Sequence, residues 1–244
     1  MSFPLLEKLL LFFSSPVDAM LTSHQINTST NPLGTTVMEC NQPGMVALAY
    51  DDGPGPYTEE LLGILKDNRV NATFFVNGNN VNGPITNPNN AQILQKAYAS
   101  GHHVGSHTWS HKDLSLLSRD QRMDEMFRLD SALEDIIGYT PRYMRPPFFS
   151  CTEDCQRDMA GWGYHIVTAN LDTKDYEEDY AQSRNTFSSA LNSSSPKNSS
   201  FIVLVHDTHE GTVEAFTKYM IDEARGYGYK LVTLGECLGD SSVH

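Results

Sequence analysis

Two adjacent carboxylates end an apolar run in the first quarter of the chain. Residues 45–50 are apolar, Asp51 and Asp52 follow them, and a Gly-Pro-Gly-Pro segment comes directly afterwards. The run predicts a buried strand, and the Gly-Pro pairs predict a turn. Neighbouring carboxylates repel each other, so a metal ion or another cation would keep both ionised. The alternative interpretation is an ordinary surface turn, because Asp and Gly are common turn residues.

Two histidines four positions apart offer further metal ligands. His107 and His111 have the His-x-x-x-His spacing. Imidazoles at this spacing can face the same side of a helical turn or a tight loop, which suits zinc. Two polar loop histidines are the alternative. With an Asp from the pair, they predict an Asp-His-His set, and three protein ligands with an open position are typical of catalytic zinc.

Five short motifs follow one another in an order that is specific as a set. They are Tyr50-Asp51-Asp52-Gly53-Pro54, Ser106-His107 through His111, Arg145-Pro146-Pro147-Phe148, Asp172-Thr173-Lys174-Asp175-Tyr176 and Leu204-Val205-His206. In these motifs the chain resembles the polysaccharide deacetylase family (carbohydrate esterase family 4), and most closely the fungal chitin deacetylases. The resemblance extends from Val46 to Leu238.

The resemblance implies a metal-dependent amide hydrolysis and assigns its central residues. Asp52, His107 and His111 would hold Zn²⁺, or another divalent metal such as Co²⁺. The metal would polarise the acetamide carbonyl and lower the pKa of a water molecule. Asp51 would be the general base. His206, whose reference pKa is near neutrality, would be the general acid that protonates the departing amine.

The remaining site residues would support this chemistry. Arg145 is expected to keep Asp51 ionised and oriented, and Asp172 either tunes His206 or braces Arg145. The family implies that the N–H of Phe148 stabilises the oxyanion, although many relatives have Tyr at this position. Leu204 would line an apolar pocket for the acetyl methyl group. The alternative is an ordinary buried strand residue, and both interpretations can hold together. Tyr176 stands where the family has Trp, and could stack on a sugar face.

The elements that must position these residues alternate between strands and helices. We expect strands over residues 45–50, 72–76, 103–106, 143–145, 164–169, 201–205 and 230–233. Thr58 is a candidate N-cap, and Ser118 with Gln121 predicts a capping box for a helix that ends before Gly138. This alternation predicts an α/β fold, a distorted (β/α) barrel with about seven parallel strands. The motif residues fall at the C-terminal strand ends, where such barrels carry their active sites.

Composition restricts the classes of partner. The chain has 244 residues and a net charge of −13, which argues against nucleic-acid binding and against strongly anionic substrates. A neutral polysaccharide such as chitin, or its oligosaccharides, fits this charge. We expect a monomer. We also expect no transmembrane span, because the apolar run at 9–13 is far too short to cross a bilayer. The segment 77–90 is rich in Asn, and either lines the substrate groove or is a plain surface loop.

Cysteines and sequons point to secretion or the cell wall. Cys151 and Cys155 could bridge locally, and the resemblance implies a bridge between Cys40 and Cys237; four reduced thiols are the alternative. Asn-x-Ser/Thr sequons occur at Asn27, Asn71, Asn192 and Asn198. We interpret 1–40 as a leader or N-terminal extension, and 41–244 as the catalytic domain. No basic segment precedes the apolar run, which is atypical of signal peptides, so an intracellular location stays open.

Three functions are therefore compared. The first is an N-deacetylase acting on chitin or its oligomers. The second is a deacetylase of the same family acting on another acetylated polymer, such as peptidoglycan or acetylxylan. The third is an inactive carbohydrate-binding relative, which would need neither the base nor the acid. The complete set of Asp51, Asp52, His107, His111 and His206 favours an enzyme.

Overall fold

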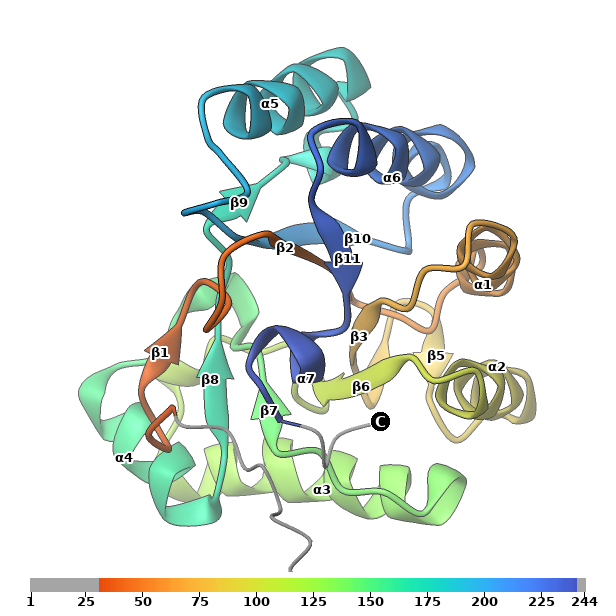
Figure 1. Cartoon of the computed structure of the whole chain (residues 1–244). Helices are drawn as coiled ribbons and strands as arrows, with labels where there is room; N and C mark the ends of the chain where they lie inside the picture. Colours follow the sequence, from red (N-terminus) through yellow and green to blue (C-terminus); the bar gives the residue numbers. More distant parts are fainter. Residues whose placement is uncertain (1–30, 241–244) are drawn as a thin grey trace, which may run out of the picture.

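The computed structural model describes residues 31–240, and one curled parallel sheet of nine strands forms its centre (Figure 1). Along the sheet the strands follow the order β1-β8-β7-β6-β3-β2-β10-β9, and β11 pairs with β2 as well. The strands are β1 (Thr36–Val37), β2 (Met45–Asp51), β3 (Thr73–Val76), β6 (His103–Ser106), β7 (Tyr143–Met144), β8 (His165–Val167), β9 (Leu171–Asp172), β10 (Phe201–His206) and β11 (Lys230–Val232). A separate antiparallel hairpin joins β4 (Asn79–Asn80) to β5 (Gly83–Pro84).

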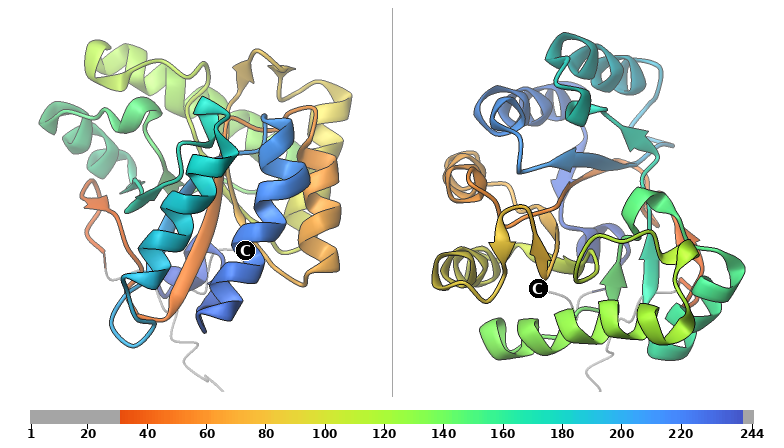
Figure 2. Two further views of the ribbon diagram at one scale, coloured as in Figure 1. Left: turned by 90° about the horizontal axis from the view of Figure 1, so that it is seen from above. Right: turned by 180° about the vertical axis from the view of Figure 1, so that it is seen from behind.

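Helices cover the outer face of the sheet (Figures 1 and 2). Around that face α5, α6, α1, α2, α3 and α4 contact one another in turn, and Figure 2 shows helices running alongside the strands. The helices are α1 (Thr58–Asp67), α2 (Pro88–Ala99), α3 (Arg119–Ile137), α4 (Glu153–Trp162), α5 (Tyr180–Asn192), α6 (Thr217–Gly226) and the short α7 (Leu234–Cys237). Single helical turns add η1 (Leu114–Leu116), η2 (Pro147–Phe149), η3 (Asp175–Glu177) and η4 (Thr212–Phe216).

This architecture confirms the predicted distorted (β/α) barrel. Each of the seven predicted strands is present, with bounds that differ by two residues at most. The sheet gains β1 at one edge and β9 at the other, and both are two residues long. Each contains a single apolar residue, Val37 or Leu171, and so lacks the apolar pattern that predicts a strand.

Alternation along β2 determines which way its carboxylate points. Val46, Leu48 and Tyr50 belong to the core between the sheet and the helices. Ala47 and Ala49 belong to the core inside the curled sheet. Because successive strand residues face opposite sides, Asp51 continues the inner face and lies at the mouth of the barrel. The two small alanines below it leave room for the large buried side chain of Arg145.

The helix boundaries agree with one predicted cap and contradict the other. Ser118 and Gln121 form the predicted capping box of α3, and Gly138 ends that helix in a left-handed conformation. The prediction for Thr58 is wrong, because the N-cap of α1 is Tyr57 and Thr58 is already helical. Its hydroxyl instead accepts a hydrogen bond from the Gly55 N–H.

Both expected disulfides are present. Cys40 is bonded to Cys237, and Cys151 is bonded to Cys155. The first bridge and the pairing of β1 with β8 tie residues of the segment 31–40 to the sheet, so that part of the segment belongs to the folded domain. Residues 1–30 of the expected leader lie outside the described residues.

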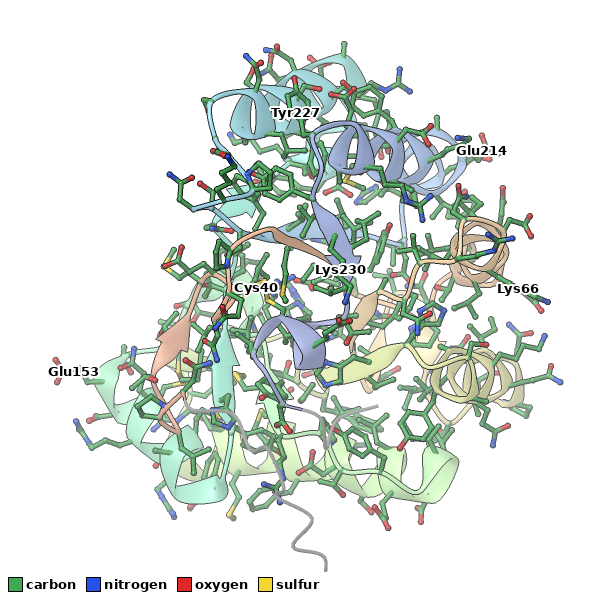
Figure 3. All side chains as sticks on the ribbon, viewed as in Figure 1. Cys40, Lys66, Glu153, Glu214, Tyr227 and Lys230 are labelled. Atoms are coloured by element: carbon green, nitrogen blue, oxygen red, sulfur yellow. A yellow bond between two sulfur atoms is a disulfide. The ribbon has the colours of Figure 1, made fainter. Side chains whose placement is uncertain are left out.

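Charged side chains lie on the outer surface. Lys66, Glu153 and Glu214 point away from the sheet at the periphery of the molecule (Figure 3). Between residues 31 and 240, no helix combines the length and apolarity that crossing a bilayer would require.

Candidate metal centre and catalytic pocket

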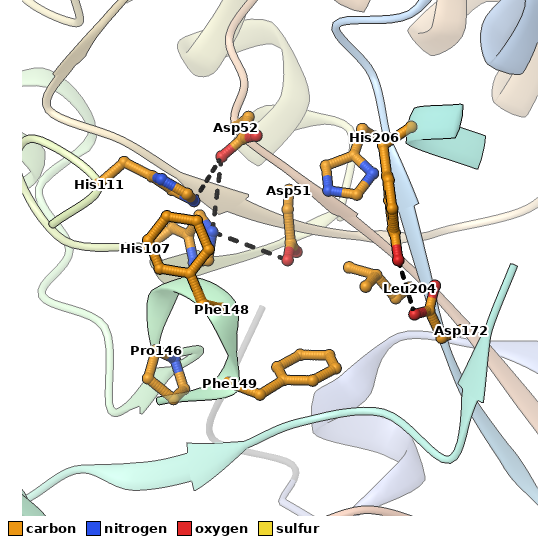
Figure 4. A pocket seen from close by; sticks show the side chains of 11 residues that line it. Asp51, Asp52, His107, His111, Pro146, Phe148, Phe149, Asp172, Leu204 and His206 are labelled. Carbon is orange, nitrogen blue, oxygen red and sulfur yellow. Dashed lines mark hydrogen bonds and ion pairs between the residues drawn. The ribbon is translucent and has the colours of Figure 1, made fainter. Parts of the chain in front are cut away.

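A pocket of about 500 Å³ opens at the C-terminal ends of the strands (Figure 4). Nine of the ten site residues predicted from the sequence line it, and Arg145 lies buried behind them. The lining residues are Asp51, Asp52, His107, His111, Pro146, Phe148, Phe149, Asp172, Tyr176, Leu204 and His206. Residues spread over most of the chain therefore meet at one place, as the barrel fold predicts.

Asp52, His107 and His111 form a group that could hold a metal ion. One ligand atom from each lies within 4.8 Å of the others. Asp52 Oδ1 is 3.5 Å from His107 Nε2 and 3.4 Å from His111 Nε2. This oxygen is buried and has no hydrogen-bond partner, so a cation between the three side chains would satisfy it. The donor set, one carboxylate and two imidazoles, fits zinc.

The hydrogen bond of His107 selects the tautomer that a metal needs. His107 Nδ1 lies 2.7 Å from the carbonyl oxygen of Arg145, and so donates its proton there. The Nε2 lone pair is then free to face Asp52 and His111. Burial lowers the pKa of His107 to about 3, which keeps the imidazole neutral. The His-x-x-x-His segment is a loop rather than a helix, with left-handed backbone at Thr108 and His111.

Asp51 and Arg145 form a buried ion pair beside this group. Arg145 Nη1 donates to Asp51 Oδ1 at 2.8 Å, and Nη2 donates to the carbonyl oxygen of Thr168 at 3.0 Å. The guanidinium also lies 4.6 Å from the ring centroid of Phe75. Burial raises the pKa of Asp51, and the charge of Arg145 opposes that shift. The structure therefore places Arg145 where it can hold the Asp51 carboxylate ionised and aimed into the pocket.

His206 is held by Asp175, not by Asp172. Its Nδ1 lies 2.9 Å from Asp175 Oδ1, and its backbone N–H donates to Asp175 Oδ2 at 2.7 Å. Asp172 instead accepts hydrogen bonds from the Lys174 N–H and the Tyr176 hydroxyl. Asp172 was expected either to tune His206 or to brace Arg145; it hydrogen-bonds to neither of them here, and its charge acts on Arg145. Asp175 stands in the same motif, and the sequence holds no signal that favours it over Asp172.

Aromatic side chains form the walls of the pocket. The Phe148 side chain is 70% exposed, and its ring packs edge-on against His111. Phe149 lies above the guanidinium of Arg145, and Tyr176 packs edge-on against His206. Leu204 of β10 contributes an apolar patch to the wall, and is only 7% exposed. The pocket thus combines titratable groups with surfaces on which a sugar ring can stack.

The Asn-rich segment supports the site from behind. No residue between 77 and 90 is among the described residues that line the pocket. Asn77 Nδ2 donates to the carbonyl oxygen of His107, and Asn80 Nδ2 donates to that of Asp52. The segment therefore braces the backbone of two candidate ligands, a role that neither interpretation of the sequence foresaw.

Comparison with known proteins gives consistent results. A model of the family described as polysaccharide deacetylase matches residues 39–167. A chitin deacetylase of Colletotrichum lindemuthianum is 48% identical over 214 residues, which cover 86% of each chain. A chitin deacetylase of a Pestalotiopsis species is 40% identical over 220 residues, covering 90% of this chain and 72% of that protein.

The structure is also similar to solved structures. The structure of the chitin deacetylase from Colletotrichum lindemuthianum superposes with a TM-score of 0.84 at 48% identity. It covers 86% of this chain and 94% of that one.

Proposed function

The chain belongs to the polysaccharide deacetylase family, and on this premise we propose that it removes N-acetyl groups from N-acetylglucosamine units of chitin or chitooligosaccharides. The products would be acetate and chitosan. The observation that carries the proposal is that the Asp52–His107–His111 group shares one pocket with Asp51 and His206, which are held by Arg145 and Asp175.

Asp52, His107 and His111 would hold a divalent metal ion, which we propose to be zinc. When bound, zinc supplies Lewis-acid chemistry that polarises the acetamide carbonyl and makes water more acidic. The other steps fall to the side chains of the chain itself. Asp51, held by Arg145, would accept a proton from the water that attacks the carbonyl carbon. The C–O bond forms as the O–H bond of the water breaks, and the π electrons of the carbonyl group move onto its oxygen.

His206 would then complete the reaction. Its imidazolium donates a proton to the amine nitrogen as the C–N bond breaks, and Asp175 stabilises the positive charge on the ring. The N–H of Phe148 would help to stabilise negative charge on the carbonyl oxygen. Leu204 would contact the acetyl methyl group, and Tyr176 and Phe148 would stack on sugar faces.

The experiment measures acetate release from N-acetylglucosamine oligomers by the purified protein, before and after treatment with a chelator and after zinc is added back. We expect activity that is lost with the chelator and restored with zinc. Peptidoglycan fragments and acetylxylan complete the panel. Release from either of these, with none from the oligomers under any metal condition, would contradict the proposed substrate. An Asp51→Asn variant separates an enzyme from a sugar-binding relative, because only catalysis needs the base.

We further propose that the protein acts in an oxidising compartment, outside the cell or in its wall. Two disulfides close within the described residues, and such bonds persist where thiols are not kept reduced. The sequon residues Asn71, Asn192 and Asn198 are exposed, as glycosylation requires. Glycosidase treatment of protein isolated from its natural source would test this, with a shift in mass as the expected result.

A further inference from the structure

Asp207 is a buried carboxyl group that the proposed mechanism does not use. It directly follows β10 and is fully buried. Strands β10 and β2 pair in a register that sets His206 opposite Asp51. Asp207 therefore comes beside the turn that carries Asp52, although it is not among the described residues lining the pocket.

The turn after β2 is wrapped around this carboxyl group. Thr58 Oγ1 donates a hydrogen bond to Asp207 Oδ2 at 2.5 Å. The same hydroxyl accepts a hydrogen bond from the Gly55 N–H at 2.7 Å. A β-carbon at Gly53 would lie 2.4 Å from Asp207 Oδ2, so the carboxyl group packs directly against the Gly53 backbone. Asp207 and Thr58 thus contact both ends of the Gly-Pro-Gly turn.

Asp52 needs such support because its backbone is left-handed, with φ of +73°. This conformation is unfavourable for a residue with a side chain, and persists only where the surroundings fix it. On one side, the side-chain amide of Asn80 donates a hydrogen bond to the carbonyl oxygen of Asp52. On the same side, the backbone N–H of Asn77 donates a hydrogen bond to the carbonyl oxygen of Gly53. On the other side lie Asp207 and Thr58.

We propose that Asp207 and Thr58 are positioning residues for Asp52. They fix the turn after β2 so that the Asp52 carboxylate stands opposite the imidazoles of His107 and His111. The inference rests on the proposed function, since it assumes that these three residues hold a metal ion. It assigns to Asp207 a role that none of the chemical steps requires, and gives a reason for burying a carboxyl group against this turn.

The test compares metal affinity in matched variants without substrate. Zinc binding is measured by competition with a chromogenic chelator, and Co²⁺ binding by its visible absorption spectrum. Asp207→Ala should weaken zinc binding about 10- to 100-fold, as loss of residues that orient metal ligands commonly does. Asp207→Asn should stay close to the wild type, because its amide oxygen can still accept the hydrogen bond from Thr58. Thr58→Val, which lacks the hydroxyl group, should bind zinc more weakly. Thr58→Ser, which keeps it, should bind zinc about as tightly as the wild type.

The thermal midpoint of each metal-free variant separates positioning from general stability. Asp207→Ala with a lowered midpoint but wild-type zinc affinity and Co²⁺ spectrum would overturn the inference. If that variant does not fold, the Thr58→Val and Thr58→Ser pair decides, and equal affinities of the two would overturn it. A failure of this inference appears as equal metal affinities. A failure of the proposed function appears instead as absent acetate release by the wild-type protein.

Discussion

The imidazole and the backbone N–H of His206 both contact the carboxylate of Asp175, at 2.9 Å and 2.7 Å. Burial by itself lowers the pKa of His206, but the hydrogen bond and the charge of Asp175, with the charges of Asp51 and Asp52, raise it to about 9. The imidazolium form therefore predominates at neutral pH, and this is the form that can protonate a departing amine.

Replacing Asp175 should change the pH dependence of catalysis. In the wild-type protein, kcat/KM should fall on the alkaline side as His206 loses its proton. In Asp175→Asn the pKa of His206 should decrease, so this fall should begin at lower pH, nearer the reference value of about 6.5. The measurement is the pH profile of kcat/KM with an N-acetylglucosamine oligomer.

Asp172→Asn is the matched control, because Asp172 bonds to Lys174 and Tyr176 rather than to His206. The alkaline limb of the kcat/KM profile of Asp172→Asn should stay at the wild-type position, whereas an unmoved limb in Asp175→Asn would refute the assignment.

The raised pKa of His206 also has a consequence for folding. The raised pKa stabilises the folded protein fully below about pH 6.5, and this contribution is lost as the pH rises through about 9.

The two adjacent carboxylates should respond differently to the same substitution. Asp51→Asn should lower kcat by roughly 10²- to 10⁴-fold, the usual contribution of a general base, with zinc affinity close to the wild type. Asp52→Asn should lower zinc affinity as well as kcat, because it removes the anionic ligand. Rate assays and metal titrations of both variants check this. Equal zinc affinities of the two variants would contradict the assignment of base and ligand.

Removing one partner of the Arg145–Asp51 pair should lower the free energy of unfolding, mainly because the charge of the other partner is then buried and unpaired. Both side chains are almost completely buried. Arg145→Met leaves the Asp51 carboxylate buried and unpaired, and should lower the free energy of unfolding by about 3–5 kcal/mol. The Asp51→Asn/Arg145→Met double variant should recover part of this loss, because no charge is then left unpaired. Urea unfolding of the two single variants, the double variant and the wild type completes the cycle; strictly additive effects would argue against coupling.

The two disulfides should differ in their effect on stability. Cys40 and Cys237 are 197 residues apart, whereas Cys151 and Cys155 are four apart. Removing the long bridge by Cys40→Ser with Cys237→Ser should lower the free energy of unfolding by roughly 2–5 kcal/mol. The Cys151→Ser/Cys155→Ser variant should lose less, because it releases a much smaller loop. Chemical unfolding of both double variants measures the difference, and a larger loss from the short bridge would contradict the entropic argument.

Long apolar runs made much of this fold predictable. β2, β3 and β10 are buried on both faces, so their sequences read as almost continuous apolar segments bounded by turn residues. Ser118 and Gln121 are predictable for a local reason, since a capping box depends on residues three apart. The two-residue strands β1 and β9 depend on pairing with distant strands, and carry no local pattern.

The site was predictable in its residue types more than in its contacts. The pocket gathers nine of the predicted residues because each lies near the C-terminal end of a parallel strand or in the loop that follows it. The choice between Asp172 and Asp175 depends on the turn η3, which lies between left-handed residues at Lys174 and Glu178 and directs Asp175 inward. Thr58 was misassigned for a similar reason: its hydroxyl serves a tertiary contact with Asp207 rather than its own helix.

Strand β2 has partners from distant parts of the chain. β10 pairs along nearly its whole length, β11 pairs with Met45–Ala47, and β3 pairs with Ala49–Asp51. During synthesis β3 emerges soon after β2, but β10 and β11 are made last among the strands. At about 5–20 residues per second, roughly 10–40 s separate β2 from β11. A nascent chain on the ribosome therefore holds an incompletely paired apolar strand for that interval, and its carboxylates meet His206 only after β10 has been made.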